Sequence, residues 1–342
     1  MHHNLVTLEK DIAIIGAGPT GLFSVFECGF MGYTCAVIDA LPHTGGQLAA
    51  LYPEKPIYDI AGHPSILAGD LVTQLEAQAA PFHPAYVLGN PVEKLEKAAD
   101  GRFVLSTKTH TVTAKVVIIA GGAGMFTPRK PQVENLAAFE NISVHYAVRE
   151  KSKFAGHEVV IAGGGDSAID WAVELAEDVA KHVHVVHRRS DFRAAEATLQ
   201  KMHTLVAAGK ITLHTPAQLH SLQGENGQIA SITLADLDGN TTVLPAQTLL
   251  CFFGLLPNPG PFSAWNLAMD GKCIATEPLT QKSSVDGILV VGDMASYPNK
   301  VSLILTGFAE AVYAAKTAQA LIDPAKKFKV QYSTSHKPGG AA

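Results

Sequence analysis

The chain has 342 residues, which is enough for about two domains of ordinary size, each able to bury a core of its own. Hydrophobic residues make up 47% and charged residues 17% of the chain, a balance that excludes a largely disordered protein. The formal net charge of −5 excludes a general basic field that would attract nucleic acid or anionic lipid.

Neither a membrane span nor a metal site is predicted. The longest nearly apolar stretch, Val116 to Phe126, has 11 residues, whereas a helix needs roughly 20 to cross a bilayer. The N-terminus from Met1 to Lys10 lacks the apolar core of a signal peptide, so we expect a cytoplasmic protein. The four cysteines form no C-x-x-C pair, and the fifteen histidines show no zinc-protease pattern.

The chain opens with an expected strand, a glycine-rich turn and a helix. The apolar run Asp11 to Ile15 precedes Gly16-Ala17-Gly18-Pro19-Thr20-Gly21, and an apolar-rich segment follows from Leu22 to Phe30. The next apolar run, Thr34 to Ile38, ends at Asp39. In a dinucleotide site, glycines let the backbone approach the pyrophosphate, the helix N-terminus offers free N–H groups, and the acid accepts ribose hydroxyls. A glycine turn alone is weak support, but these pieces in register predict a dinucleotide site.

The same pattern recurs in the middle of the chain. Glu158 to Ala162 predicts a strand, and Gly163-Gly164-Gly165-Asp166-Ser167-Ala168 is a second glycine turn with helical spacing after it. The next strand, Val183 to Val186, leads to His187-Arg188-Arg189, and Arg193 follows closely. Guanidinium groups bind the 2′-phosphate of NADP, which an acid would repel. This site is therefore predicted to prefer NADP(H) to NAD(H); the alternative is a solvated helix start.

The two halves look like distant internal repeats. Each is expected to add a β-hairpin, at Phe103 to Thr107 with Thr111 to Ala114 in the first half and at Ile229 to Ala235 with Thr241 to Leu244 in the second. In each half a buried strand then leads to a glycine.

After the second half the chain is expected to return to the first fold. Gly287 to Val291 predicts a strand that ends at Gly292-Asp293, and a helix is expected from about Val301 to Leu321. This order predicts an α/β protein with two Rossmann-like, doubly wound, three-layer dinucleotide-binding domains, the second inserted into the first. We place the first domain at 1–124 and 284–342 and the inserted domain at 125–283.

At this point the chain resembles the thioredoxin-reductase-like ferredoxin–NADP(+) reductases, from about Asp11 to Ser335. The stretches that carry the resemblance are Gly45-Gly46-Gln47-Leu48, Leu51-Tyr52-Pro53-Glu54-Lys55, Ile57-Tyr58-Asp59, the second glycine turn, His187-Arg188-Arg189, Gly292-Asp293 and Tyr332-Ser333-Thr334-Ser335. In thioredoxin reductases a redox-active cysteine pair lies just before the second glycine turn, where this chain reads His145-Tyr146-Ala147-Val148-Arg149. The resemblance therefore implies that a flavin reduced by NADPH passes electrons directly to a partner.

The resemblance also implies which residues bind each cofactor. Besides Gly16, Gly18, Pro19, Thr20 and Gly21, the residues expected at FAD are Asp39 on the adenosine ribose, Gly46, Gln47, Leu48 and Tyr52 toward the flavin, Val92 and Phe126 along the site, Gly292 and Asp293 at the ribityl chain, and Thr334 near the flavin. Tyr52 and Tyr332 would stack on opposite faces of the flavin ring. The alternatives are ordinary packing for Tyr52, a surface amide for Gln47 and a tail residue that does not stack for Tyr332. The residues expected at NADP(H) are Gly163, Gly165, Asp166, Ser167, His187, Arg188, Arg189 and Arg193.

The resemblance implies a FAD-dependent ferredoxin or flavodoxin–NADP(+) oxidoreductase. Hydride would pass between NADPH and FAD, and single electrons would pass to the carrier protein, with no catalytic side chain or metal required. An acidic carrier needs a local basic patch, for which the candidates are Arg129 with Lys130, Lys151 with Lys153, and Lys326, Lys327 and Lys329.

Family members are homodimers, so a homodimer is expected, without nucleic acid or membrane partners. The alternatives are an NADPH-dependent reductase of free flavin, quinone or oxygen, and a non-catalytic FAD/NADP(H) redox sensor.

Overall fold

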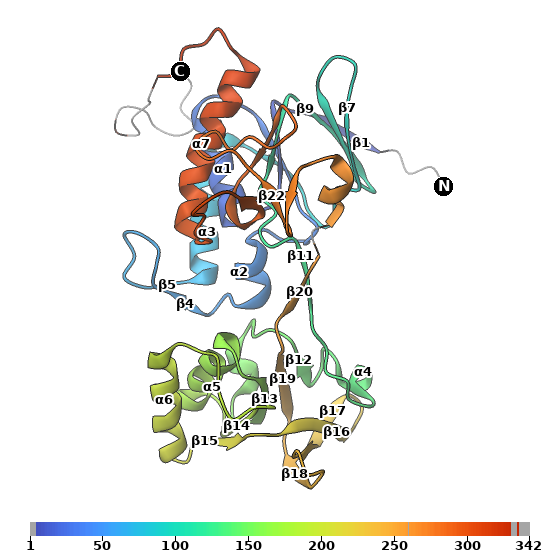
Figure 1. Cartoon of the computed structure of the whole chain (residues 1–342), viewed down its shortest axis with the longest axis vertical. Coiled ribbons are helices and arrows are strands. Elements are labelled where there is room, and N and C mark those ends of the chain that lie inside the picture. Colours follow the sequence, from blue (N-terminus) through green and yellow to red (C-terminus); the bar gives the residue numbers. More distant parts are fainter. Residues whose placement is uncertain (1–4, 259, 330–333, 335–342) are drawn as a thin grey trace. The chain divides into compact units, whose positions relative to one another are not determined.

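The computed structural model describes residues 5–258, 260–329 and 334, without the side chains at 125, 126, 257 and 258. It divides into two compact units (Figure 1). Unit 1 comprises Met1–Phe126 and Pro257–Ala342, and unit 2 comprises Thr127–Leu256. One unit is thus inserted into the other, as the order of sequence motifs predicts. The linking segments β11 (Met125–Pro128) and β20 (Leu255–Asn258) pair as a two-stranded sheet.

Unit 1 is built on a parallel sheet of five strands. In spatial order these are β23 (Ile288–Val290), β10 (Val116–Ile119), β2 (Ile12–Ile15), β3 (Cys35–Ile38) and β6 (Ala85–Val87). Every residue of β2 is buried, because neighbouring layers cover both faces of the sheet. The apolar runs of the sequence therefore form the centre of the fold.

The two faces of this sheet are covered by different layers. Ile12 and Ile14 belong to a core cluster with residues of α1 and α7, whereas Ala13 and Ile15 belong to a cluster on the opposite face with Phe103. The helical layer contains α1 (Pro19–Phe30), α3 (Ala68–Ala79) and α7 (Ile304–Ile322). The other layer is a second sheet, in the order β1 (Val6–Glu9), β9 (His110–Ala114), β8 (Phe103–Ser106) and β7 (Lys94–Lys97). The predicted three layers are confirmed, although strands rather than helices form the third.

Smaller elements complete unit 1. They are α2 (Gly46–Leu51), β4 (Pro56–Ile57), β5 (Ile66–Leu67), and the short 3-10 helices η1 (Ala80–Phe82), η3 (Gly260–Trp265) and η4 (Gly292–Met294). A small sheet joins β21 (Met269–Asp270), β22 (Cys273–Ala275) and β24 (Ala295–Ser296).

The chain returns to unit 1 earlier than expected. The predicted boundary was 284, but Pro257 already belongs to unit 1. The physical reason is that Phe262 and Trp265 of η3 pack edge to face, with their ring centroids 5.1 Å apart, in the same core cluster as Phe103. Apolar residues of the segment 260–283, Phe262, Trp265, Leu267 and Ile274, thus complete the core of the first unit.

Unit 2 repeats the parallel sheet. Its strands lie in the order β12 (Val144–His145), β19 (Thr248–Phe252), β13 (Glu158–Gly163), β14 (His182–Val186) and β15 (Ile211–His214). In both units the strand before the glycine turn, β2 or β13, is central, which supports the predicted internal repeat.

Helices cover one face of this sheet and strands the other. The helices α5 (Asp166–Asp178) and α6 (Glu196–Ala207) pack against each other, and α5 also packs on β13 and β14. The opposite cluster includes residues from the antiparallel strands β16 (Gln218–Glu225), β17 (Gln228–Ala235) and β18 (Thr241–Pro245). Both predicted hairpins are therefore confirmed. The short elements α4 (Leu136–Phe139) and η2 (Lys151–Phe154) complete this unit. Among the described residues, no helix of either unit is long and apolar enough to cross a membrane.

A histidine cluster lies on the sheet of unit 2. The Nδ1 atom of His184 is 3.1 Å from Nε2 of His214, and its ring centroid is 4.7 Å from that of His182. The Nε2 atom of His184 lies 3.7 Å from a Glu158 oxygen. Burial, together with the nearby His182 and His214, lowers the pKa of His184 from 6.5 to about 4. The folded protein therefore favours neutral His184.

Unit 2 should lose stability in mild acid because of this cluster. The folded-state pKa of His184 lies below the unfolded value, so its contribution is fully present above about pH 6.5 and declines as pH falls toward about 4. We expect His184→Leu to reduce the loss of thermal stability over this range, whereas His203→Leu, at an exposed position of α6, should leave it unchanged. A Trp265→Phe background leaves the buried Trp171 as the fluorescent reporter of unit 2. Equal pH dependence in all three proteins would contradict the prediction.

Candidate nucleotide-binding sites

The first glycine turn brings backbone segments together more closely than side chains permit. A Cβ atom at Gly16 would lie 2.2 Å from the Ala120 carbonyl oxygen, and one at Gly21 would lie 1.9 Å from the Gly16 carbonyl oxygen. Both positions therefore need glycine. The first turn of α1, which begins at Pro19 after Gly18, has no side-chain cap. Its backbone N–H groups are thus available to an anion at the positive end of the helix dipole.

Asp39 lies at the end of β3, where the sequence predicts it, and braces this turn. Its Oδ2 atom accepts a hydrogen bond from the Ala17 N–H at 2.6 Å, and Oδ1 accepts one from the Leu41 N–H at 2.8 Å. Burial raises the pKa of Asp39, while these backbone donors oppose that shift. Each carboxylate oxygen retains a lone pair that could accept a ribose hydroxyl.

A second glycine pair packs directly on the first turn. Gly45 donates its N–H to the Ala17 carbonyl at 2.8 Å, and a Cβ at Gly46 would lie 3.1 Å from the Gly18 Cα. Gln47 follows in α2 and is half-buried. Leu48 is 5% exposed and packs in the core, so its side chain anchors α2.

The Gly292-Asp293 turn lies near the same helix end. A Cβ at Gly292 would come within 3.3 Å of the Thr20 hydroxyl oxygen, which places this turn beside the start of α1. Burial raises the pKa of Tyr52, and the Asp293 carboxylate raises it further. The structure therefore brings Thr20 and Tyr52 close to the Gly292-Asp293 turn, although these three segments are far apart in the sequence. Burial also raises the pKa of Asp293, against the effect of Lys300.

For the other residues expected at FAD, the described part of the chain gives no contact that supports a role in binding. Val92 is 5% exposed and packs in the core, so little of its side chain is available to a ligand. Tyr332 and the side chain of Phe126 lie outside the described residues, and Thr334 is exposed. Their roles stay predictions.

Glu310 is a residue that the sequence analysis missed. Its carboxylate is 3% exposed and accepts the Gly292 N–H at 2.6 Å. It also accepts hydrogen bonds from the Tyr297 hydroxyl and the Lys300 ammonium group. The available signal was a carboxylate within the segment 304–312, which is otherwise apolar except for Thr306, with a lysine and a tyrosine shortly before it.

The second glycine turn has the same close packing. A Cβ at Gly163 would lie 2.5 Å from the Phe252 carbonyl oxygen. Gly165 precedes α5, whose first turn has no side-chain cap. Asp166 and Ser167 are exposed at the helix start, and Asp166 Oδ1 accepts the Ala195 N–H at 3.0 Å. This helix end is also available to an anion.

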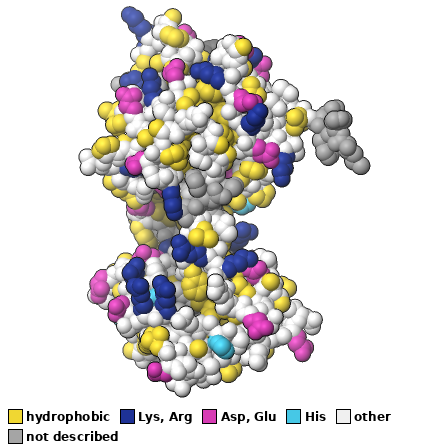
Figure 2. Space-filling view, turned by 45° about the vertical axis from the view of Figure 1, so that its right-hand side comes forward, with side chains coloured by type: hydrophobic (Ala, Val, Ile, Leu, Met, Phe, Trp, Pro, Cys, Tyr) yellow, Lys and Arg dark blue, Asp and Glu magenta, His cyan; other side chains and the backbone are white. Residues whose placement is uncertain are grey.

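The predicted arginines lie close to this turn. The Arg193 N–H donates to the Gly164 carbonyl at 2.7 Å, which holds the arginine-bearing loop against the glycines. Arg188, Arg189 and Arg193 are exposed, and none forms an ion pair with a carboxylate in the part of the chain that the structure describes. Figure 2 shows several Lys and Arg side chains close together on unit 2. The loop therefore offers guanidinium groups that a phosphate could bind.

His187 packs beneath the same loop. A Cβ at Gly164 would meet the His187 ring at 2.4 Å, and this ring stacks on Phe192 with centroids 5.5 Å apart. Burial lowers the pKa of His187, and Arg188 and Arg189 lower it further. The ring is therefore neutral near pH 7 and supports the loop by packing.

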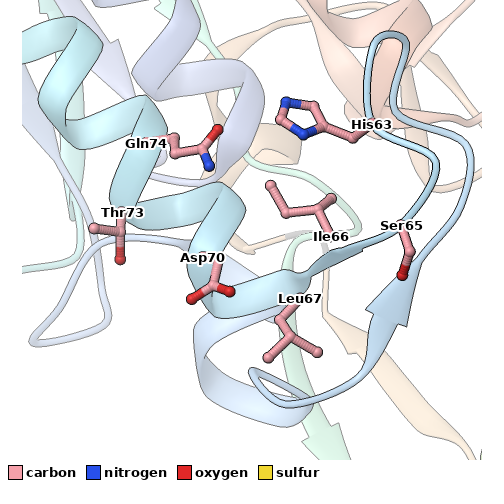
Figure 3. Close-up of a pocket in the computed structure, with 7 residues that line it drawn as sticks. All are labelled: His63, Ser65, Ile66, Leu67, Asp70, Thr73 and Gln74. Atoms are coloured by element: carbon pink, nitrogen blue, oxygen red, sulfur yellow. The ribbon is translucent and has the colours of Figure 1, made fainter.

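One polar hollow in unit 1 is separate from these residues. It has a volume of about 480 Å³ and lies between the β4–β5 loop and α3 (Figure 3). Its lining residues are His63, Ser65, Ile66, Leu67, Asp70, Thr73 and Gln74. None of them is among the residues predicted to bind a nucleotide. Among the described residues, no group of three or more His, Cys, Asp or Glu could hold a metal ion.

Comparison with known proteins shows the family. The model of the pyridine nucleotide-disulphide oxidoreductase family matches residues 10–318. A ferredoxin–NADP reductase from Paramagnetospirillum magneticum is 48% identical over 96% of this chain and 97% of the relative, and one from Rickettsia bellii is 45% identical over 96% and 98%.

Solved structures show the same fold. Thioredoxin reductase from T. acidophilum superposes with a TM-score of 0.75 at 22% identity, covering 91% of this chain and 98% of that structure. Thioredoxin reductase from Lactococcus lactis gives the same TM-score and identity over 92% and 99%. The match of the family model and the identity to the two reductases show that the chain belongs to the pyridine nucleotide-disulphide oxidoreductase family.

Proposed function

We propose that this chain is a FAD-dependent ferredoxin–NADP(+) reductase, which moves electrons between NADP(H) and ferredoxin or flavodoxin. The observation that carries the proposal is the pair of glycine turns, each followed by a helix whose first turn has no side-chain cap. Asp39 accepts a backbone hydrogen bond from the first turn, and exposed arginines lie beside the second. Relatives at 44–48% identity over nearly their full length carry the ferredoxin–NADP reductase name.

The residues of unit 1 fit FAD. Gly16, Gly18 and Gly46 pack backbone against backbone and add no side chains of their own, so a pyrophosphate could approach this turn closely, and the uncapped start of α1 provides N–H donors. Asp39 would bind the adenosine ribose, and Asp293 and Tyr52 would hold the ribityl chain and one face of the flavin. Bound FAD would supply the redox chemistry, since a flavin exchanges electrons with both nicotinamides and one-electron carriers.

Unit 2 fits NADP(H). The start of α5 would hold the pyrophosphate, and Arg188, Arg189 and Arg193 would bind the 2′-phosphate. The two cofactor assignments make unit 1 the FAD domain and unit 2 the NADP(H) domain.

The position of the cysteines favours an external electron acceptor. They stand at 28, 35, 251 and 273, and none falls in the segment 145–149 where the resemblance places the dithiol of thioredoxin reductases. Cys251 is 3% exposed, and burial raises its pKa to about 12, so this thiol is unsuited to act as a nucleophile.

The candidate docking patches for an acidic carrier differ in whether their basic side chains are already paired with carboxylates. Lys130 pairs with Glu140, and Lys151 and Lys153 also have carboxylate partners. Lys327 and Lys329 are exposed and have no such partner among the described residues, and in the other two patches only Arg129 shares this property. The group formed by Lys326, Lys327 and Lys329, called the tail group, therefore has the stronger claim to bind ferredoxin or flavodoxin. A homodimeric state and a cytoplasmic location remain predictions.

The reaction itself can be tested with the purified full-length protein. We expect a bound-flavin spectrum that NADPH bleaches without oxygen, followed by reduction of cytochrome c that depends on added ferredoxin. Bleaching without ferredoxin-dependent turnover would instead support reduction of free flavin, quinone or oxygen, or a sensor. A protein that takes up no FAD would contradict the assignment of unit 1.

The arginines should set the preference for NADPH. We expect Arg188→Ala with Arg189→Ala to raise KM for NADPH about tenfold or more and to change KM for NADH little, because NADH has no 2′-phosphate. Steady-state kinetics with both nucleotides measure this difference. Lys201→Ala, at an exposed position of α6 in the same unit, is the control. Equal effects of the double substitution on the two nucleotides would refute the assignment.

Reversing one charge of the tail group should weaken carrier binding. We expect Lys327→Glu to raise KM for ferredoxin about threefold or more at low ionic strength, with a smaller effect in high salt and unchanged KM for NADPH. The control is Lys108→Glu, an exposed lysine on the turn between β8 and β9 of the same unit. If both variants changed KM for ferredoxin equally, the tail group would have no special role.

A further inference from the structure

The Gly292-Asp293 turn is held from two sides inside unit 1. On one side Thr20 of α1 fits between two glycines, since a Cβ at Gly292 or Gly307 would lie 3.3 or 2.3 Å from its hydroxyl oxygen. On the other side Glu310 of α7 accepts the Gly292 N–H at 2.6 Å. The turn therefore cannot shift without changing the contact between α1 and α7.

The Glu310 carboxylate is itself immobilised. Oε2 accepts the Gly292 N–H, and Oε1 accepts hydrogen bonds from the Tyr297 hydroxyl and the Lys300 ammonium group. The side chains of Lys300 and Glu310 are 9% and 3% exposed, and the ammonium lies 5.4 Å from the Tyr297 ring centroid. Buried ions need such partners, because removing one member of a buried ion pair leaves an uncompensated charge and is strongly destabilising.

We infer that Glu310, locked in place by Tyr297 and Lys300, is a positioning residue for the flavin site, because it fixes the turn that carries Asp293. This inference rests on the proposed function, in which Asp293 holds the ribityl chain of FAD. Glu310 does not touch the cofactor in this assignment. Glu310 acts through the Gly292 N–H, and the ammonium group of Lys300 balances the negative charge that Glu310 places near Asp293.

The test is the affinity of the full-length protein for FAD after the cofactor has been stripped and returned in a fluorescence titration. Glu310→Leu removes the acceptor of the Gly292 N–H, and we expect it to weaken FAD binding about tenfold or more. Tyr297→Phe removes one hydrogen bond to Glu310 and keeps the ring, so we expect a loss of about threefold. If Glu310→Leu fails to fold, Tyr297→Phe decides, and unchanged affinity in that variant would overturn the inference.

A rescue separates positioning from general stability. Glu310→Gln combined with Lys300→Met removes both buried charges but keeps an amide oxygen for the Gly292 N–H, and FAD affinity should stay within about threefold of the parent. The matched control is Gln319→Ala, which removes another buried, hydrogen-bonded side chain of α7. Its thermal stability should fall while FAD affinity stays within about twofold of the parent.

The outcomes distinguish this inference from the proposed function. If the parent binds FAD and Glu310→Leu binds it equally well, or if Gln319→Ala weakens binding as much as Glu310→Leu, the inference fails alone. If the parent itself takes up no FAD, the proposed function fails and the inference with it.

Discussion

Close approach of backbone to backbone at the two glycine turns determines where each nucleotide can lie. At Gly16, Gly21 and Gly163 an added Cβ would come within 2.5 Å of a carbonyl oxygen, so the helix packs onto its strand with nothing between them. The start of each helix is thereby directed to the carboxyl edge of its parallel sheet, where ligands of such folds bind. Because neither helix has a side-chain cap, a bound phosphate would complete the hydrogen bonding of its first turn.

The two units use one architecture and differ at the end of a single strand. In unit 1, β3 ends at Asp39, whose carboxylate binds the backbone of its own glycine turn. In unit 2 the corresponding strand, β14, leads to His187, which packs on Gly164 and leaves the following arginines to solvent. The same fold therefore presents an acceptor for ribose hydroxyls in one unit and donors for a phosphate in the other. Under the proposed assignment, the difference between the two cofactors would arise from a few residues on a repeated frame.

Local patterns predicted the glycine turns and the helices after them, because strand, turn and helix are adjacent in the sequence and each has its own composition. The return of the chain to unit 1 was placed too late, at 284, because Phe262 and Trp265 look like any apolar residues until their core is known. Glu310 was missed for a related reason. Its partners, Gly292, Tyr297 and Lys300, precede it by 18, 13 and 10 residues, and they reach its carboxylate because α7 packs against η4.

A buried ion pair is a poor way to gain stability, which raises the question of why α7 carries the acidic member of one, Glu310, paired with Lys300 in the segment before the helix. Well-packed apolar residues in place of Lys300 and Glu310 would often be neutral or stabilising by about 1–4 kcal/mol. Apolar residues could not, however, accept the Gly292 N–H, and a buried donor without a partner costs about 1–3 kcal/mol and frees the turn to move. The Glu310 carboxylate accepts the Gly292 N–H, and the ammonium group of Lys300 compensates the charge of the buried carboxylate. The energetic cost of the pair is therefore best explained by the geometry that it imposes on the turn carrying Asp293.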